Sequence, residues 1–177
     1  KSFIQVLVLC VTISFVLSSC QKDDSIEQSD FISASVNDKN WNGTPEIYID
    51  NANDSLTILG YGNEQHIFIK IKFKGEGTYN LENSRSNYYT TIGGDVITSF
   101  YTFDANSTSQ LKITNYNSEL NIIEGEFEIS LLKEWSNPEN DNDKTIFKNG
   151  EFRGTIGDWR SKNYLQQRIS QMAGLIE

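Results

Sequence analysis

The candidates for catalysis in this sequence are a single histidine and 24 acidic side chains. His66 is the only histidine, so any Ser-His-Asp triad would have to use it as the base. It begins a segment of alternating residues, on the face that also carries lysines, where we expect it to be exposed. A histidine-based zinc site is not expected either, because such sites draw on several His or Cys side chains. The sequence therefore offers no convincing pair of nucleophile and base.

Three glutamates alternate along one predicted strand. Glu124, Glu126 and Glu128 would share a face with neighbours about 7 Å apart, a separation within the range that glycosidase carboxylates use. Like charges repeated on a wet strand face are more commonly a solvated surface. We therefore expect no enzymatic activity and no cofactor, and a hydrolase that uses acidic residues is the alternative.

Oxygen-bearing side chains also alternate in one polar loop. Glu139, Asp141 and Asp143 could supply part of the six to eight oxygens that calcium takes. Lys144 stands where an EF-hand-type loop has glycine, and no glutamate follows at the closing position. We expect a solvated loop here, with calcium as an incomplete match.

Aromatic residues make up 12% of the chain and could form a binding surface. Exposed Tyr or Trp rings can stack on sugars or dock a protein partner, although most such residues lie in cores or half-buried strands. From this set we select Tyr88, Tyr89 and Trp135 as a candidate platform for a glycan or protein partner.

These candidates must be positioned by a β-rich domain. From residue 31 onward, short alternating runs are separated by Asn, Asp and Gly, which is typical of all-β domains with tight turns. In residues 66–74, isoleucines occupy one face while Lys70, Lys72 and Lys74 occupy the other, which predicts one buried and one wet face. We expect this lysine ladder to face the glutamate ladder on a neighbouring strand.

The pattern predicts roughly ten strands. Gly93-Gly94 and Asn149-Gly150 are hairpin signals, because both dipeptides tolerate positive φ. We expect an antiparallel two-layer sandwich, with a closed lipocalin-like β-barrel and its ligand cavity as the alternative. The predicted strands are residues 31–36, 46–50, 55–61, 66–74, 78–81, 87–92, 96–103, 110–116, 120–132, 144–148 and 151–156.

The last segment, residues 158–177, has a different periodicity. Apolar residues recur at spacings of four, three and four, which predicts one apolar stripe on a short amphipathic helix: Leu165, Ile169, Met172 and Ile176. We expect this helix to pack against the sheet, and a partner-binding or frayed tail is the alternative.

The N-terminal segment has the organisation of an export signal. Lys1 precedes an apolar run, residues 3–17, that is shorter than the roughly 20 residues of a membrane-spanning helix but suits a secretory signal. Leu17-Ser18-Ser19-Cys20, at its end, resembles the lipobox of bacterial lipoproteins. That resemblance implies diacylglycerol on the Cys20 thiol, cleavage before Cys20 and acylation of the new amino group, for example by palmitate. An uncleaved anchor is the alternative.

The expected lipidation determines which cysteines remain free in the mature protein and how the chain divides into segments. Two or three acyl chains give stable anchoring, whereas one holds only marginally. Cys10 lies in the removed segment and Cys20 carries lipid, so the mature domain has no disulfide and must be stabilised by its hydrophobic core. The expected plan is a signal peptide (1–19), a lipidated polar tether (20–30), a β domain (31–157) and the C-terminal helix (158–177).

The charge balance excludes one class of partner. The chain has a net charge of −9 and no basic run, whereas phosphate backbones are bound by Lys and Arg. We therefore exclude nucleic acid. The acidity favours a solvated body held off the membrane that anchors it.

Two further resemblances concern the cellular location and the family of the protein. Gln21-Lys22-Asp23-Asp24 resembles the lipoprotein export signal of Bacteroidota, which implies display on the outer face of the outer membrane, with a periplasm-facing anchor as the alternative. The body resembles small uncharacterised lipoproteins of that phylum, which are domains of unknown function, so no catalytic residue transfers. The segments that carry this resemblance are residues 36–41, 77–81, 123–129 and 149–152.

The favoured function is thus a non-enzymatic surface lipoprotein that binds a glycan, a protein or a host factor, or serves in envelope assembly. Its rival is a carrier of a small ligand or a hydrolase. A cavity lined by inward aromatics would favour the carrier, and a flat exposed aromatic patch would favour the binder.

Overall fold

A computed structural model describes residues 28–81, 85–139 and 142–157. The all-β class is confirmed, with ten strands and no helix in these ranges. The signal peptide, most of the tether and the expected C-terminal helix lie outside the described residues. The strands are β1 (Phe31–Val36), β2 (Lys39–Asp50), β3 (Ser55–Tyr61), β4 (Gln65–Lys72), β5 (Gly77–Asn80), β6 (Asn87–Ile92), β7 (Val96–Phe103), β8 (Gln110–Asn117), β9 (Ile122–Ser136) and β10 (Lys144–Gly157).

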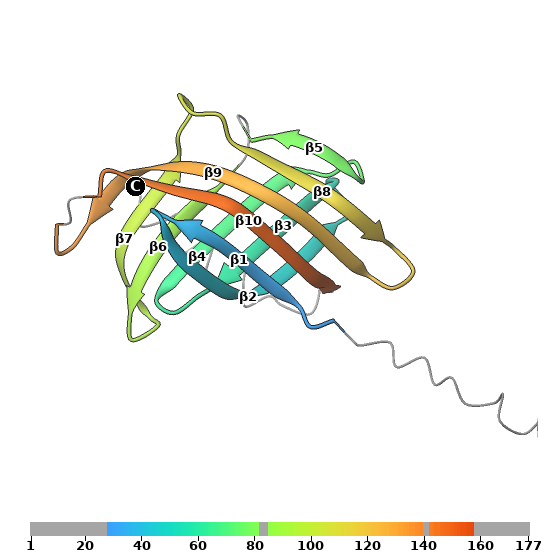
Figure 1. The fold of residues 1–177 in the computed structure, drawn as a ribbon, viewed down its shortest axis with the longest axis horizontal. Coiled ribbons are helices and arrows are strands. Elements are labelled where there is room, and N and C mark those ends of the chain that lie inside the picture. Colours follow the sequence, from blue (N-terminus) through green and yellow to red (C-terminus); the bar gives the residue numbers. More distant parts are fainter. Residues whose placement is uncertain (1–27, 82–84, 140–141, 158–177) are drawn as a thin grey trace, which may run out of the picture.

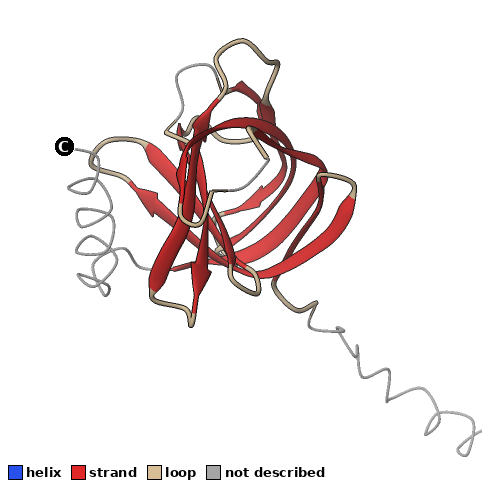
Figure 2. Ribbon diagram, turned by 90° about the vertical axis from the view of Figure 1, so that its left-hand side faces the viewer, coloured by secondary structure: helices blue, strands red, loops and turns tan. Residues whose placement is uncertain are grey.

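The ten strands form one sheet that closes on itself (Figures 1 and 2). Pairing runs from β1 through β2, β3, β4, β6, β7, β9 and β10, and β10 pairs back to β1. Strands β8 and β5 continue the sheet from the first half of β9. Every pairing is antiparallel except a short parallel one between the ends of β10 and β2. This pairing is that of a closed β-barrel, the alternative to the two-layer sandwich. Side chains from opposite walls pack against each other across the interior, as those of the two layers of a sandwich do.

Strict alternation places the core inside the ring. Ile67 and Ile69 of β4 are 1% and 0% exposed, and Phe127 and Ile129 of β9 are equally buried, as the pattern predicts. One large cluster of buried side chains joins the walls, with Phe127, Phe147 and Phe152 among its largest members.

The predicted contact between the lysine and glutamate ladders is wrong. Strand β4 pairs with β3 and β6, whereas β9 pairs with β7, β8 and β10, so the two ladders are not on neighbouring strands. Two of the glutamates form ion pairs with other strands: Glu126 lies 3.5 Å from Lys112 of β8, and Glu124 lies 3.1 Å from Arg153 of β10. Cross-strand charge pairing therefore occurs, but with partners that only the closed topology specifies.

One of the two predicted hairpins is confirmed. Gly93 and Gly94 adopt φ values of +67° and +81° in the turn between β6 and β7. The Asn149-Gly150 hairpin is wrong, because both residues lie within the continuous strand β10. Asn149 does have positive φ, +50°, but the chain makes a bulge against β9 there, where the register shifts between Phe147 and Gly150.

Candidate ligand cavity and outer aromatic face

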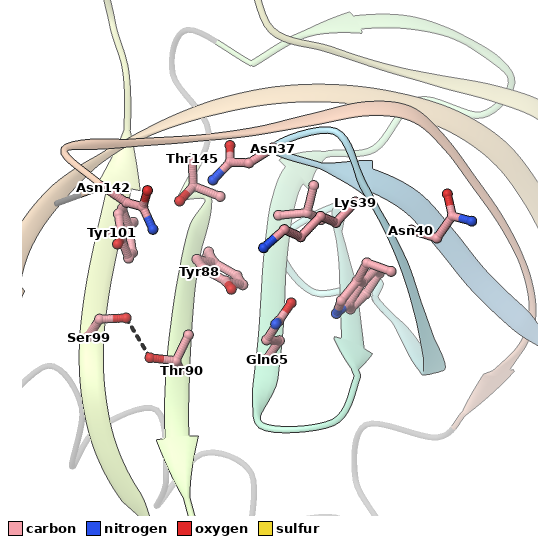
Figure 3. A pocket seen from close by; sticks show the side chains of 12 residues that line it. Asn37, Lys39, Asn40, Gln65, Tyr88, Thr90, Ser99, Tyr101, Asn142 and Thr145 are labelled. Atoms are coloured by element: carbon pink, nitrogen blue, oxygen red, sulfur yellow. Dashed lines mark hydrogen bonds between the residues drawn. The ribbon is translucent and has the colours of Figure 1, made fainter. Parts of the chain in front are cut away.

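A cavity of about 460 Å³ lies inside the ring, between the β1–β2 turn, β4, β6, β7 and the start of β10 (Figure 3). Its volume is within the range of small-ligand sites. Exposed residues of the β1–β2 turn form part of its rim, and buried aromatic rings lie deeper. The lining residues are Val36, Asn37, Lys39, Asn40, Trp41, Gln65, Tyr88, Thr90, Ser99, Tyr101, Asn142 and Thr145.

Three inward aromatic rings line the cavity. Tyr88 of β6 and Tyr101 of β7 are directly paired across the two strands, with ring centroids 5.5 Å apart. Trp41 of β2 is 5% exposed, and both Trp41 and Tyr88 pack edge-on against Phe147, at 5.7 and 5.3 Å. Burial raises the pKa of Tyr88 well above its usual value, and Tyr101 adds to that rise. The Tyr88 phenol therefore stays protonated and can donate a hydrogen bond.

The indole of Trp41 has an unused donor. Its Nε1 is buried and has no hydrogen-bond acceptor among the described residues. A Cβ at Gly62 would lie only 2.3 Å from this nitrogen, so a glycine at that position is what admits the indole. Leaving a buried donor unsatisfied costs about 1–3 kcal/mol. Because this nitrogen is itself buried and packs against Gly62, the unsatisfied donor is a cost of the fold and not an open contact point of the cavity.

Apart from Val36, the other described lining residues are polar, and Lys39 is the one charged residue among them. Thr90 and Ser99 share a hydrogen bond of 2.6 Å on one wall, and Thr90 also bonds to Thr98 at 2.8 Å (Figure 3). Lys39, the first residue of β2, extends over the cavity toward Tyr88 (Figure 3). None of the described lining residues is acidic, so they supply no carboxylate pair for a hydrolase.

The predicted aromatic platform is divided by the strand alternation. Tyr88 points into the cavity, whereas its neighbour Tyr89 lies on the outside of the ring. Tyr89 and Trp135 are each paired with Phe100 of β7, so these two do share one outer row. The cavity residues Lys39, Trp41 and Tyr101 were missed, although the alternation of Phe100 and Tyr101 in β7 was a signal for the last.

That outer row crosses five strands. It runs through Tyr61, His66, Tyr89, Phe100 and Trp135, each paired with the next. His66 packs between Tyr61 and Tyr89, with ring centroids 5.6 and 4.8 Å away. Its Nε2 lies 3.3 Å from Thr91 Oγ1, which donates to Glu64 at 2.5 Å. The histidine is thus half-buried among aromatic rings, not exposed as predicted.

A second apolar cluster adjoins this row. Tyr48, Leu59 and Phe68 form a group separate from the main core, with Tyr61 packed against it. They alternate with core residues such as Ile47, Ile58 and Ile67, so they lie on the outside of the sheet. We call this surface the outer aromatic face: Tyr48, Leu59, Tyr61, His66, Phe68, Tyr89 and Phe100.

The loop considered for calcium is organised by a lysine. Lys133 contacts both Glu139 and Asp143, the latter at 3.2 Å. The hydrogen bond to Glu139, with a second to Asp143, raises the pKa of Lys133 above its usual value. Asp141 lies outside the described residues. The part of the chain that the structure describes holds no group of three His, Cys, Asp or Glu side chains arranged to bind a metal.

Comparison with known proteins gives a family without an assigned activity. Within the described ranges, no helix is long and apolar enough to cross a membrane. No curated protein and no solved structure matches this chain. A family model, "Domain of unknown function (DUF6252)", matches residues 28–154, which run from just before β1 nearly to the end of β10. The chain belongs to the DUF6252 family.

Proposed function

We propose that this protein is a non-enzymatic, lipid-anchored binding module of the bacterial envelope, whose cavity takes a small ring-containing ligand with an anionic group. The observation that carries the proposal is an aromatic-lined cavity in which Lys39 is the one charged residue among the described lining residues. A carboxylated sugar has the matching chemistry.

Each part of such a ligand has a counterpart in the cavity. A ring can pack against Trp41, Tyr88 and Tyr101, as sugars do on aromatic surfaces. Its hydroxyl groups can bond to the amides and hydroxyls of the wall. The carboxylate would pair with the Lys39 ammonium, and this charge-assisted bond is about twice as strong as a neutral one.

A matched pair of sugars tests the ligand class. We expect galacturonate to raise the melting temperature and to bind measurably by calorimetry, and galactose to bind more weakly because it lacks the carboxylate. Lys39→Met should raise the Kd for galacturonate about tenfold, which corresponds to about 1.4 kcal/mol. Trp41→Phe should weaken the binding of both sugars, since both lose part of the aromatic surface on which the ring packs.

Lys72→Met is the matched control, because Lys72 is an exposed lysine that does not line the cavity. It should leave both affinities unchanged. Binding of the two sugars with equal affinity would remove the role of Lys39. No stabilisation by either sugar would exclude a carboxylated sugar as the ligand.

The anchor follows from the sequence. Cys20 would carry the lipid, and residues 20–30 would link it to β1, which begins at Phe31. The end of that tether is fastened to the domain: Asp30 accepts hydrogen bonds from the Thr155 backbone N–H at 2.8 Å and from Arg153 at 3.2 Å. A lipid on Cys20 would therefore tie the domain to the membrane through a linker that joins the ring at β1.

Cell fractionation and protease treatment of intact cells test membrane anchoring and surface display. The parent protein should be in the membrane fraction and should be removed by external protease. The Cys20→Ser variant should be lost from the membrane fraction. Serine has no thiol to carry the diacylglycerol, so the variant lacks the lipid on which anchoring depends. A variant with Lys22, Asp23 and Asp24 replaced by Ala should stay membrane-bound but resist the protease. Equal resistance of parent and variant would contradict surface display.

A further inference from the structure

The outer aromatic face is buried, although it lies outside the ring. Tyr48 is 4% exposed, Leu59 5%, Phe68 7% and Phe100 6%. Outward side chains of a closed sheet normally face water. The described strands make close contacts with their neighbours in the sheet. No described strand lies across the outer aromatic face (Figures 1 and 2). Because these exposed fractions are those of the single chain, burial to this degree requires a cover from another part of the same chain.

We propose that the cover is the C-terminal segment of the same chain, residues 158–177, docked through its apolar stripe. The stripe consists of Leu165, Ile169, Met172 and Ile176, at the spacing of one helix face. Leu59, Phe68 and Phe100 offer an apolar surface of the kind that such a stripe buries. This inference concerns the outside of the ring and does not depend on the ligand of the cavity.

The chain enters this segment at the edge of the face. Strand β10 ends at Gly157, which is paired in parallel with Tyr48 of β2. A Cβ at Gly157 would lie 3.0 Å from the Tyr48 ring, so the segment starts in contact with a member of the face. This fixed starting point gives the segment an effective concentration of about millimolar or higher, which a separate partner would have to exceed.

The length of the segment suits the width of the face. Residues 158–177 would extend about 30 Å as a helix, at about 1.5 Å per residue. The face spans β2, β3, β4, β6 and β7, which at about 4.8 Å between strands is about 20 Å across. One helix laid across these strands would therefore reach from Tyr48 to Phe100.

Charge also favours this occupant over a second copy of the acidic domain. The segment contains Arg160, Lys162 and Arg168 against two acidic residues, whereas the whole chain has a net charge of −9. Glu46 lies on β2 next to Tyr48, and Glu64 lies in the turn beside His66. Two copies facing each other through this surface would bring like charges together.

A photo-crosslinking amino acid at position 169 of the full chain tests the proposal. Crosslinks should map by mass spectrometry within the same molecule, to peptides of β3, β4 or β7. The same group at position 167, on the opposite side of the predicted helix, should give at least several-fold fewer of these products. Crosslinks to a second copy or to other proteins, equal yields from both positions, or no crosslink to the face would each overturn the proposal.

Discussion

Phe147→Ala is expected to lower the free energy of unfolding by about 3–5 kcal/mol, the usual cost of removing a buried phenylalanine ring. Phe147 is fully buried on β10 and contacts three other rings, those of Trp41, Tyr88 and Phe127. Two of these rings line the ligand cavity, so the loss of Phe147 removes the support behind them. Urea unfolding followed by tryptophan fluorescence measures the change, which is a large part of the 5–15 kcal/mol typical of a domain.

The control for this substitution is Leu120→Ala. Leu120 is 64% exposed, so its truncation should change the free energy of unfolding by no more than about 0.5 kcal/mol. In the Phe147 variant, the cavity should also become larger and its aromatic walls less fixed. An equal effect of the two substitutions would mean that the Trp41, Tyr88 and Phe127 rings do not close around Phe147.

Much of the fold was predictable because alternation is a local property of a strand. The bounds of β1, β3, β6 and β7 agree with the prediction residue for residue. The Asn149-Gly150 signal also acted locally, since Asn149 has positive φ. It did not make a hairpin, because both flanking segments pair with the same strand, β9. The outcome depended on long-range pairing, which a local pattern does not contain.

The site was less predictable than the fold, for the same reason. Tyr88 and Tyr89 are adjacent, so their placement on one platform already conflicted with strand alternation. Trp41 and Tyr101 share a cavity only because the ring brings β2 and β7 round to the same interior. Phe68 shares the strand face that the lysines predict to be wet, and its burial outside the ring depends on what covers it. Sequence periodicity identifies faces but not the partners of those faces.

A buried carboxylate, that of Asp104, lies directly after the C-terminal end of β7. Asp104 is 3% exposed and accepts hydrogen bonds from Lys144 Nζ at 2.8 Å, Ser107 Oγ at 2.5 Å and the Asn106 backbone N–H at 3.0 Å. The hydrogen bond from Lys144 is the largest cause, followed by that from Ser107, and together they hold the pKa of Asp104 well below its usual range despite its burial. This network joins the loop after β7 to the start of β10, next to the cavity residue Thr145.

Asp104→Asn is expected to lower the free energy of unfolding by about 2–3 kcal/mol at pH 7, because hydrogen bonds to a charged group are lost. The difference should depend on pH. The unfolded Asp titrates near 3.9, so between that pH and the lower native pKa the unfolded chain binds more protons. The contribution of Asp104 is therefore fully present above about pH 5 and is lost as the pH falls toward the native pKa. Urea unfolding of parent and variant between pH 7 and pH 2.5 should show the two curves converging.

Asp143→Asn is the matched control for this pH dependence. It makes the same chemical change one residue before Lys144, but the Asp143 side chain is 92% exposed in its pair with Lys133. Exposed pairs contribute at most about 1 kcal/mol, because water and salt screen them. The control should thus follow the parent curve closely at every pH. A constant difference between the parent and Asp104→Asn down to pH 2.5 would show that Asp104 is not the buried anion that joins β7 to β10.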